Sequence, residues 1–426
     1  MATKLAVIAD DLTGALDTGV QFLNNGLRAR VLIDCAALSA ADADHADVIV
    51  INIDSRHLDR EQACQRVRAA VEYAQSIGCS TIYKKTDSVL RGNIGGEMET
   101  VLALSGEKYL VFAPAFPRQN RFTRQGKQYI KETPIDETEF RNDPFDPIAT
   151  ASIREIIARQ SNLPVVLIPD QSWPKDLPEG PAILVFDAET EDDLARISSL
   201  ISRHGVHTIA GCAGLAAHLS LSAGISDGGR AVSFPRANLV VVSGSMMATT
   251  AAQIRKAREK GFEPIGFRQD VPDYFNTDDG LRMAQRILDG YEAGQDIIVS
   301  SANGLADRRE DAPSGSLDVA QQLGQLVRQL LRRAPGLPLM IIGGDTLLAS
   351  LRSIGAQYAE PILEVESGVV LNRVKSGCGV HYLVCKSGGL GGRDVLVKIR
   401  QFVREHSVRP AAAGVKSSAY TAYIAQ

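Results

Sequence analysis

The start of the chain constrains its fold more than any other stretch, because a short apolar run ends at two adjacent acidic residues. Residues 4–9 have the composition of a buried parallel strand, and Asp10 and Asp11 follow directly. Apolar residues then recur at helical spacing (Leu16, Val20, Leu23), with Gly26 as a stop signal. Ligands of open α/β sheets bind outside the carboxyl ends of the strands, where both acids would lie. One of the two could instead simply cap the helix.

The same pattern recurs along the first half of the chain. Apolar runs that end in polar residues predict strands at 48–53, 81–83 and 109–113, and an apolar stripe at 67–77 predicts a crossover helix. Further strands are expected at 165–168, 182–186 and 207–210. Residues 114–123, rich in Pro and Arg, predict a long loop. Alternating strands and helices favour a mainly parallel sheet.

The second half repeats this organisation after a Gly-rich stretch at 222–230, which we interpret as a domain boundary and hinge. Strands are expected at 239–242, 296–299, 339–342 and 381–385, and helices at 249–260, 347–354 and 393–404. The fold class is therefore α/β, with two α/β domains, each a mainly parallel sheet flanked by helices, and an active site in the interdomain cleft. We expect domains at 1–228 and 236–406, and a tail at 407–426.

Composition narrows the class of function. With 46 basic and 50 acidic residues among 426, the net charge is −4, which argues against nucleic-acid and membrane partners. The six cysteines form no CxxC pair, and no apolar stretch approaches the roughly 20 residues of a membrane span. We expect a soluble cytoplasmic protein that acts on a small molecule, with a homodimer as the assembly to consider.

Charged residues gather at the expected strand ends of the first domain: Asp10, Asp11, Arg56, Lys84, Lys85, Asp87 and Arg91. Cations in this number suit a carboxylate or a phosphate, and the acids suit hydroxyl groups or Mg²⁺. For Lys84 alone, a solvated strand end is the simpler interpretation. The sequence shows neither a hydrolytic triad nor the spacing of a metal site, so metal ligands stay unassigned.

Three strand ends of the second domain carry Ser or Thr with Gly, at 243–245, 343–346 and 387–389. Glycine lets backbone N–H groups approach a phosphate, and a following helix N-terminus favours an anion. Such turns are often plain connections, but three in one domain favour phosphate binding. Neither a Walker sequence nor GxGxxG follows a strand, so the cradle is of another type.

Several segments together resemble one known family. In order, they are 8–15 (Ile-Ala-Asp-Asp-Leu-Thr-Gly-Ala), 84–93 (Lys-Lys-Thr-Asp-Ser-Val-Leu-Arg-Gly-Asn), 114–117, 343–346 and 386–389, and they resemble motifs of the four-carbon acid sugar kinases. The resemblance implies an N-terminal domain that binds a sugar acid through Asp10, Asp11, Arg56, Lys84, Lys85, Thr86, Asp87 and Arg91. It implies ATP binding by Ser243, Gly343, Gly344, Asp345, Thr346 and Gly389.

The resemblance also bears on the substrate. The branch that acts on 3-oxo-tetronates tends to carry Ser-Thr-Phe-Asp-Ser-Thr where this chain has residues 85–88 (Lys-Thr-Asp-Ser), so the chain is more similar to the D-threonate and D-erythronate kinases. Asn120 replaces the Gly usual before the loop residue Arg121, and Leu390 replaces the usual Phe of the last glycine motif.

The resulting hypothesis is transfer of the γ-phosphoryl group of ATP, with Mg²⁺, to a terminal hydroxyl of a four-carbon sugar acid, with D-threonate favoured and the 4-phosphate as product. Asp11, Asp87 and Arg91 are the expected catalytic residues, and the general base is one of Asp10, Asp11 and Asp87. Arg56, Lys85 and Arg91 would hold the carboxylate or the transferred phosphoryl group.

Alternatives remain at two levels. The substrate could be D-erythronate or a 3-oxo-tetronate. From other classes, a Mg²⁺-dependent phosphatase with Asp10 or Asp11 as nucleophile would use the carboxylate that ends the first strand. A non-catalytic sugar-acid sensor is the other alternative.

Overall fold

The computed structural model describes residues 5–35, 38–39, 46–143, 145–219, 232–301 and 316–408. The chain divides into two compact units. The first comprises Met1–Gly228 together with Tyr358–Ser367, and the second comprises Gly229–Gln357 with Gly368–Gln426. The expected hinge at 222–230 and all but the first two residues of the expected tail lie outside the described residues.

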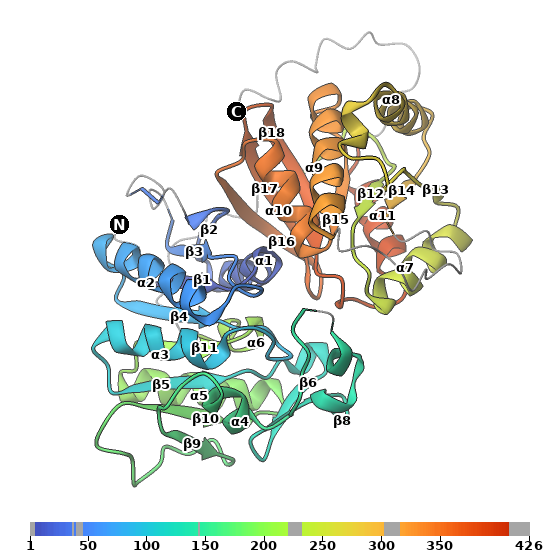
Figure 1. Ribbon diagram of the computed structural model, residues 1–426. Helices are drawn as coiled ribbons and strands as arrows, with labels where there is room; N and C mark the ends of the chain where they lie inside the picture. Colours follow the sequence, from blue (N-terminus) through green and yellow to red (C-terminus); the bar gives the residue numbers. More distant parts are fainter. Residues whose placement is uncertain are drawn as a thin grey trace. The chain divides into compact units, whose positions relative to one another are not determined.

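The first unit is built on a mainly parallel sheet (Figure 1). Its strand order is β16 (Tyr358–Glu366), β2 (Ala29–Leu32), β3 (Val48–Asn52), β1 (Leu5–Ala9), β4 (Thr81–Lys85), β11 (Thr208–Gly211), β5 (Tyr109–Ala113), β10 (Ala182–Phe186) and β9 (Val165–Ile168). Every neighbouring pair is parallel except β16 with β2. Strands such as β1 and β10 are buried along their whole length, which explains why their sequences are continuously apolar.

Helices cover both faces of this sheet (Figure 1). One layer contains α1 (Leu12–Gln21), α6 (Ala213–Ala216) and α5 (Glu191–His204), and the other contains α2 (Arg60–Ser76), α3 (Ile94–Ser105) and α4 (Ile153–Ala158). Ile8, Ile51 and Val71 belong to a core cluster between sheet and helices.

The late segment 358–367 corrects the predicted domain division, which assigned it to the second domain. β16 pairs with β2 in antiparallel register, with Tyr358 opposite Leu32. The guanidinium of Arg30 lies 4.2 Å from the ring centroid of Tyr358 and 3.4 Å from a carboxylate oxygen of Glu360. Because β2 has its hydrogen-bonding edge free on the side away from β3, it accepts a strand from far along the chain.

The predicted loop at 114–123 is only partly a loop. From Arg121 the chain forms a small antiparallel sheet of β6 (Arg121–Arg124), β7 (Lys127–Ile130) and β8 (Thr133–Pro134). Gln125 and Gly126 both have positive φ (50° and 67°), as a two-residue hairpin turn requires. We call residues 114–134 the arm.

The second unit repeats the architecture. Its sheet has the order β13 (Glu263–Ile265), β14 (Ile297–Ser300), β12 (Val240–Ser243), β15 (Leu339–Ile342), β18 (Gly379–Lys386) and β17 (Val369–Ser376), parallel as far as β18. One layer contains α8 (Asp278–Glu292), α9 (Ser316–Arg333) and α10 (Gly344–Ser353), and the other contains α7 (Ala248–Glu259) and α11 (Val395–Glu405). The predicted fold class, mainly parallel sheets flanked by helices, is confirmed.

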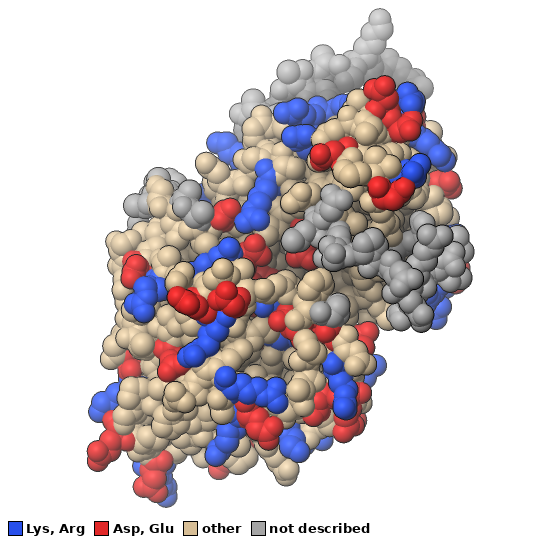
Figure 2. All heavy atoms as spheres, in the orientation of Figure 1, with Lys and Arg blue, Asp and Glu red and all other residues tan. Residues whose placement is uncertain are grey.

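The surface carries charges of both signs. Basic and acidic side chains are interspersed over the face shown in Figure 2. Within the described ranges, no helix has both the length and the apolar character needed to cross a membrane.

Candidate active site

The carboxyl ends of the central strands of the first unit lie in register. Ala9 of β1 is the partner of Asn52 in β3 and of Lys85 in β4, and Lys85 is also the partner of Gly211 in β11. The segments that follow these strands therefore begin at one edge of the sheet. They carry the acids and cations that the sequence singled out.

Arg56 joins the two adjacent acids. Its guanidinium donates to Oδ2 of Asp10 from Nε (2.8 Å) and from Nη2 (2.7 Å), and Nη2 also donates to Oδ1 of Asp11 (2.6 Å). Asp11 is also the N-cap of α1, accepting from the backbone N–H of Gly14 at 3.2 Å. Asp11 therefore caps the helix and at the same time contacts Arg56.

The environment keeps Asp11 ionised. Burial acts to raise the pKa of this carboxyl, but the positive charges of Arg56 and Lys85 outweigh it and lower the pKa to about 2. The ammonium of Lys85 lies 3.6 Å from Oδ1 of Asp10 and 3.9 Å from Oδ1 of Asp11. A Cβ atom at Gly14 would lie 2.4 Å from that ammonium and 2.5 Å from Oδ1 of Asp11, so a side chain at this position would displace these groups.

Asp87 and Arg91 form a second pair, in the loop after β4. Arg91 donates to the two oxygens of Asp87 from Nε (2.8 Å) and Nη2 (3.3 Å), and its Nη1 donates to Asp143 at 3.1 Å. Burial opposes ionisation, but Arg91 and Arg56 hold the pKa of Asp87 well below its ordinary value. Arg56 Nη2 lies 3.8 Å from Oδ1 of Asp87, which links the two groups of charges. We call Asp10, Asp11, Arg56, Lys85, Asp87 and Arg91 the acid–cation cluster.

Lys84 does not join this cluster. Successive strand residues point to opposite faces of a sheet, and the ammonium of Lys84 lies 2.8 Å from Oε2 of Glu97 on α3. The side chains are 0% and 2% exposed, so the interpretation of Lys84 as a solvated strand end is wrong. Thr86 is also fully buried; its hydroxyl has no hydrogen-bond partner among the described residues, and its backbone N–H donates to Gly211.

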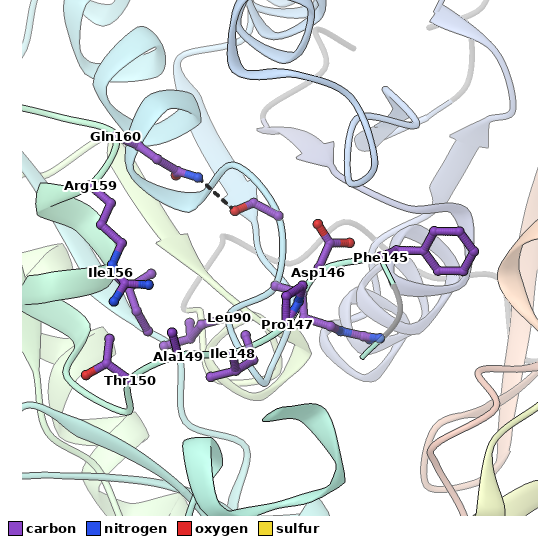
Figure 3. Close-up of a pocket in the computed structure, with 12 residues that line it drawn as sticks. Leu90, Phe145, Asp146, Pro147, Ile148, Ala149, Thr150, Ile156, Arg159 and Gln160 are labelled. Atoms are coloured by element: carbon purple, nitrogen blue, oxygen red, sulfur yellow. Dashed lines mark hydrogen bonds between the residues drawn. The ribbon is translucent and has the colours of Figure 1, made fainter. Parts of the chain in front are cut away.

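A pocket of about 240 Å³ lies beside the same loop (Figure 3). Arg91 is the cluster residue that lines it, together with Leu90, residues 145–150 and the end of α4. Gln160 fixes this part of the loop, because its amide donates to the carbonyl of Gly92 (3.1 Å) and accepts from the N–H of Gly95 (2.8 Å).

The strand ends of the second unit also lie in register. Ser243 is the partner of both Ser300 and Ile342, and Ile342 is the partner of Lys386. The predicted glycine turns therefore meet at one edge. A Cβ atom at Gly244 would lie 2.1 Å from the hydroxyl of Thr346, and one at Gly388 would lie 2.1 Å from the hydroxyl of Ser245.

These contacts show how the predicted nucleotide residues are arranged. Gly343 and Gly344 begin α10, whose N-terminus is at this edge, and Asp345 is exposed in its first turn. Ser243 is fully buried, and its hydroxyl has no partner among the described residues. Gly389 lies in the turn after β18, which Thr250 anchors by donating to the carbonyl of Gly388 at 2.8 Å.

The sequence analysis assigned no role to two residues that are buried at this edge. Gln253, in the middle of α7, is fully buried, and its amide donates to the carbonyls of Leu390 (3.0 Å), Gly391 (3.0 Å) and Gly392 (3.2 Å). Nothing distinguishes it in the sequence from other helical glutamines. Lys386 is 1% exposed, and burial lowers its pKa to about 7. The sequence did mark its position, because Lys386 is a basic residue at the end of an apolar run, just before a glycine turn.

No group of three or more His, Cys, Asp or Glu residues is arranged to hold a metal ion within the part of the chain that the structure describes. Mg²⁺ commonly reaches phosphate-transfer sites with the nucleotide, held by one or two carboxylates and water. The exposed carboxylate of Asp345 at the glycine turns is compatible with that role.

Two domain families match the chain. The sugar-binding N-terminal domain matches residues 5–219, and the nucleotide-binding C-terminal domain matches residues 240–396. A solved structure from Salmonella typhimurium has a TM-score of 0.73 at 21% identity and covers 93% of this chain and 98% of its own, which supports the fold.

Relatives of similar length are kinases. The D-threonate kinase of Salmonella typhimurium is 30% identical, over 94% of this chain and 99% of that protein. The D-erythronate kinase of Heliobacterium modesticaldum is 27% identical (92% and 95% covered), and the 3-oxo-tetronate kinase of Pseudomonas fluorescens is 26% identical (92% and 96% covered). A sugar-binding and a nucleotide-binding domain in one chain, with these relatives, define an ATP-dependent sugar-acid kinase. The chain belongs to the four-carbon acid sugar kinase family.

The buried pair of Lys84 and Glu97 gives a first prediction. Lys84→Met leaves the carboxylate of Glu97 buried without its counter-charge, so we expect the free energy of unfolding to fall by about 3–5 kcal/mol. The double variant Lys84→Met/Glu97→Leu should recover most of this loss, and Lys127→Met, on an exposed strand position, should change little. Denaturant unfolding measures all three. Unchanged stability with selective loss of sugar-acid binding would instead make Lys84 a substrate residue.

Lys386 gives a second prediction, on the pH dependence of stability. Its pKa falls from 10.5 to about 7 on folding, so below about pH 7 the folded protein carries the full cost of a buried charge. Between pH 7 and 10.5 the unfolded chain binds the proton and the folded chain does not, so stability rises with pH. Lys386→Met should therefore melt above the wild type at about pH 6, and the difference should shrink by about pH 9.5. A difference in melting temperature that stays constant with pH would contradict this.

Proposed function

We propose that the enzyme transfers the γ-phosphoryl group of ATP to the terminal hydroxyl of D-threonate, giving D-threonate 4-phosphate. The observation that carries the proposal is the acid–cation cluster at the sheet edge of the sugar-binding unit. Residues 85–88 (Lys-Thr-Asp-Ser) differ from the segment typical of 3-oxo-tetronate kinases, which supports a tetronate without the oxo group. D-Erythronate, which differs in configuration at one carbon, is the second candidate.

The cluster offers groups for both binding and chemistry. Sugar hydroxyls can donate to Asp10 and Asp87, while Arg56, Lys85 and Arg91 provide positive charge for the anionic groups of the reactants. Of the three acids, Asp11 has the most exposed side chain, at 16% against 4% for Asp10 and 11% for Asp87. Because Asp11 is also ionised at neutral pH, we assign it the role of the base that accepts the hydroxyl proton.

The second unit would hold the nucleotide. Backbone N–H groups of the glycine turns and the N-terminus of α10 provide donors for phosphate oxygens, with Ser243, Gly343, Gly344, Thr346 and Gly389 as binding residues. Asp345 would hold Mg²⁺ through its carboxylate. When bound, Mg²⁺ supplies charge neutralisation for the phosphates.

A substrate panel tests the reaction. ADP release is measured with ATP and Mg²⁺ on D- and L-threonate, D- and L-erythronate and pentonates. We expect turnover on four-carbon acids, fastest on D-threonate. Preference for D-erythronate would correct the substrate and keep the reaction class, whereas ATP binding without turnover of any four-carbon acid would refute the proposal.

Asp11→Asn tests the base. Asparagine is also a good N-cap, so α1 should keep its start while the charge is lost. We expect kcat to fall at least about 100-fold with ATP affinity unchanged. Asp59→Asn is the matched control, because Asp59 caps α2 in the same way and is exposed. Full activity of Asp11→Asn would remove Asp11 from the proton transfer.

A further inference from the structure

Arg121, at the start of β6, differs from the cations of the acid–cation cluster. Arg56, Lys85 and Arg91 each have carboxylate partners. Arg121 is largely buried, yet it has no ion pair among the described residues, and its buried Nε has no hydrogen-bond partner there. Its Nη1 donates only to the backbone carbonyl of Gln119. A buried cation with no anion in direct contact is costly, so this arrangement favours an anionic ligand.

The arm holds Arg121 firmly at the edge of the site. Its backbone exchanges two hydrogen bonds with Phe116, at 2.8 and 3.1 Å. Gln128, fully buried on β7, donates to the carbonyls of Ser88 (2.9 Å) and Pro114 (3.3 Å), so the arm is tied to the loop that carries Asp87 and Arg91. A second contact ties the arm to the segment after β16, because the amide of Gln119 donates to the hydroxyl of Ser367 at 2.6 Å.

The electrostatic environment of Arg121 agrees with the position that the arm gives it. Burial lowers the pKa of its guanidinium; Asp87, Cys212 and Glu139 act against this shift, and Arg91 adds to it. Together with the hydrogen bond from Gln128 to Ser88, which ties the arm to the loop after β4, this places Arg121 on the Asp87 side of the cluster. Asp87 and Arg91 already satisfy each other, so Arg121 is the cation there with hydrogen-bonding capacity to spare.

We propose that Arg121 binds the carboxylate of the sugar acid and thereby selects acids over neutral four-carbon polyols. The planar guanidinium offers parallel N–H donors that match a carboxylate, which a lysine ammonium cannot reproduce. The inference rests on the proposed function and refines it: the carboxylate lies at Arg121, which leaves Arg56, Lys85 and Arg91 to position the acids and the transferred phosphoryl group.

The experiment compares Arg121→Gln with Arg118→Gln in the full-length protein. Arg118 is in the same arm, but it is exposed and paired with Glu191, so it is the matched control. We expect Arg121→Gln to raise KM for the acid about 10- to 100-fold with KM for ATP unchanged. Its weaker activity on the corresponding neutral polyol, and its melting temperature, should stay close to wild type. Arg121→Lys should recover only part of the loss, and calorimetric titration of the acid without ATP should show the same order of affinities.

The outcomes distinguish a failure of the proposed function from a failure of the role proposed for Arg121. If the wild type turned over no four-carbon acid, the proposed function itself would fail. If the wild type were active and Arg121→Gln kept its KM and affinity for the acid, only the role of Arg121 would be overturned. Equal losses on acid and polyol together with a lowered melting temperature would make Arg121 a structural residue, which also overturns the inference.

Discussion

The contact between Arg56 and the adjacent carboxylates of Asp10 and Asp11 is the interaction on which the site depends. Two acids at the end of a buried strand repel each other, and a guanidinium that donates to both offsets this repulsion and holds them close together. The same guanidinium lies near Asp87, so one side chain connects the segments that follow β1, β3 and β4. Parallel register makes this possible, because it brings segments far apart in sequence to one edge.

In the second unit, close contacts between turns, and not ion pairs, hold the segments at the sheet edge together. Its turns come close where Gly244 approaches the hydroxyl of Thr346 and where Gly388 approaches the hydroxyl of Ser245, so a Cβ atom on either glycine would displace that hydroxyl. Gln253 then holds three successive carbonyls of the last turn from α7. Turns of this kind can offer backbone N–H groups to an anion with many oxygens.

Local patterns predicted the strands that are buried on both faces, because burial makes their sequences continuously apolar, as in β1, β10 and β15. They also predicted that Asp10 and Asp11 follow a buried strand and that Asp87 and Arg91 lie in the loop after the next strand along the site edge, as the structure has them. The patterns failed where partners are distant. Neither the pairing of β16 with β2 nor that of Lys84 with Glu97 leaves a local trace. Arg121 was visible as a loop residue, but its missing counter-charge is a property of the folded chain alone.

The placement of β16 has a consequence for how the protein is made. The sugar-binding unit receives an edge strand that lies beyond Gln357, so its sheet stays incomplete while the ribosome translates the chain from Gly229 to Gln357. At roughly 5–20 residues per second this interval lasts on the order of ten seconds. During it the nascent chain presents β2 as an open edge, a template for pairing with other chains. Cotranslational folding of this enzyme is therefore not strictly domain by domain: the first unit finishes only after most of the second has been synthesised.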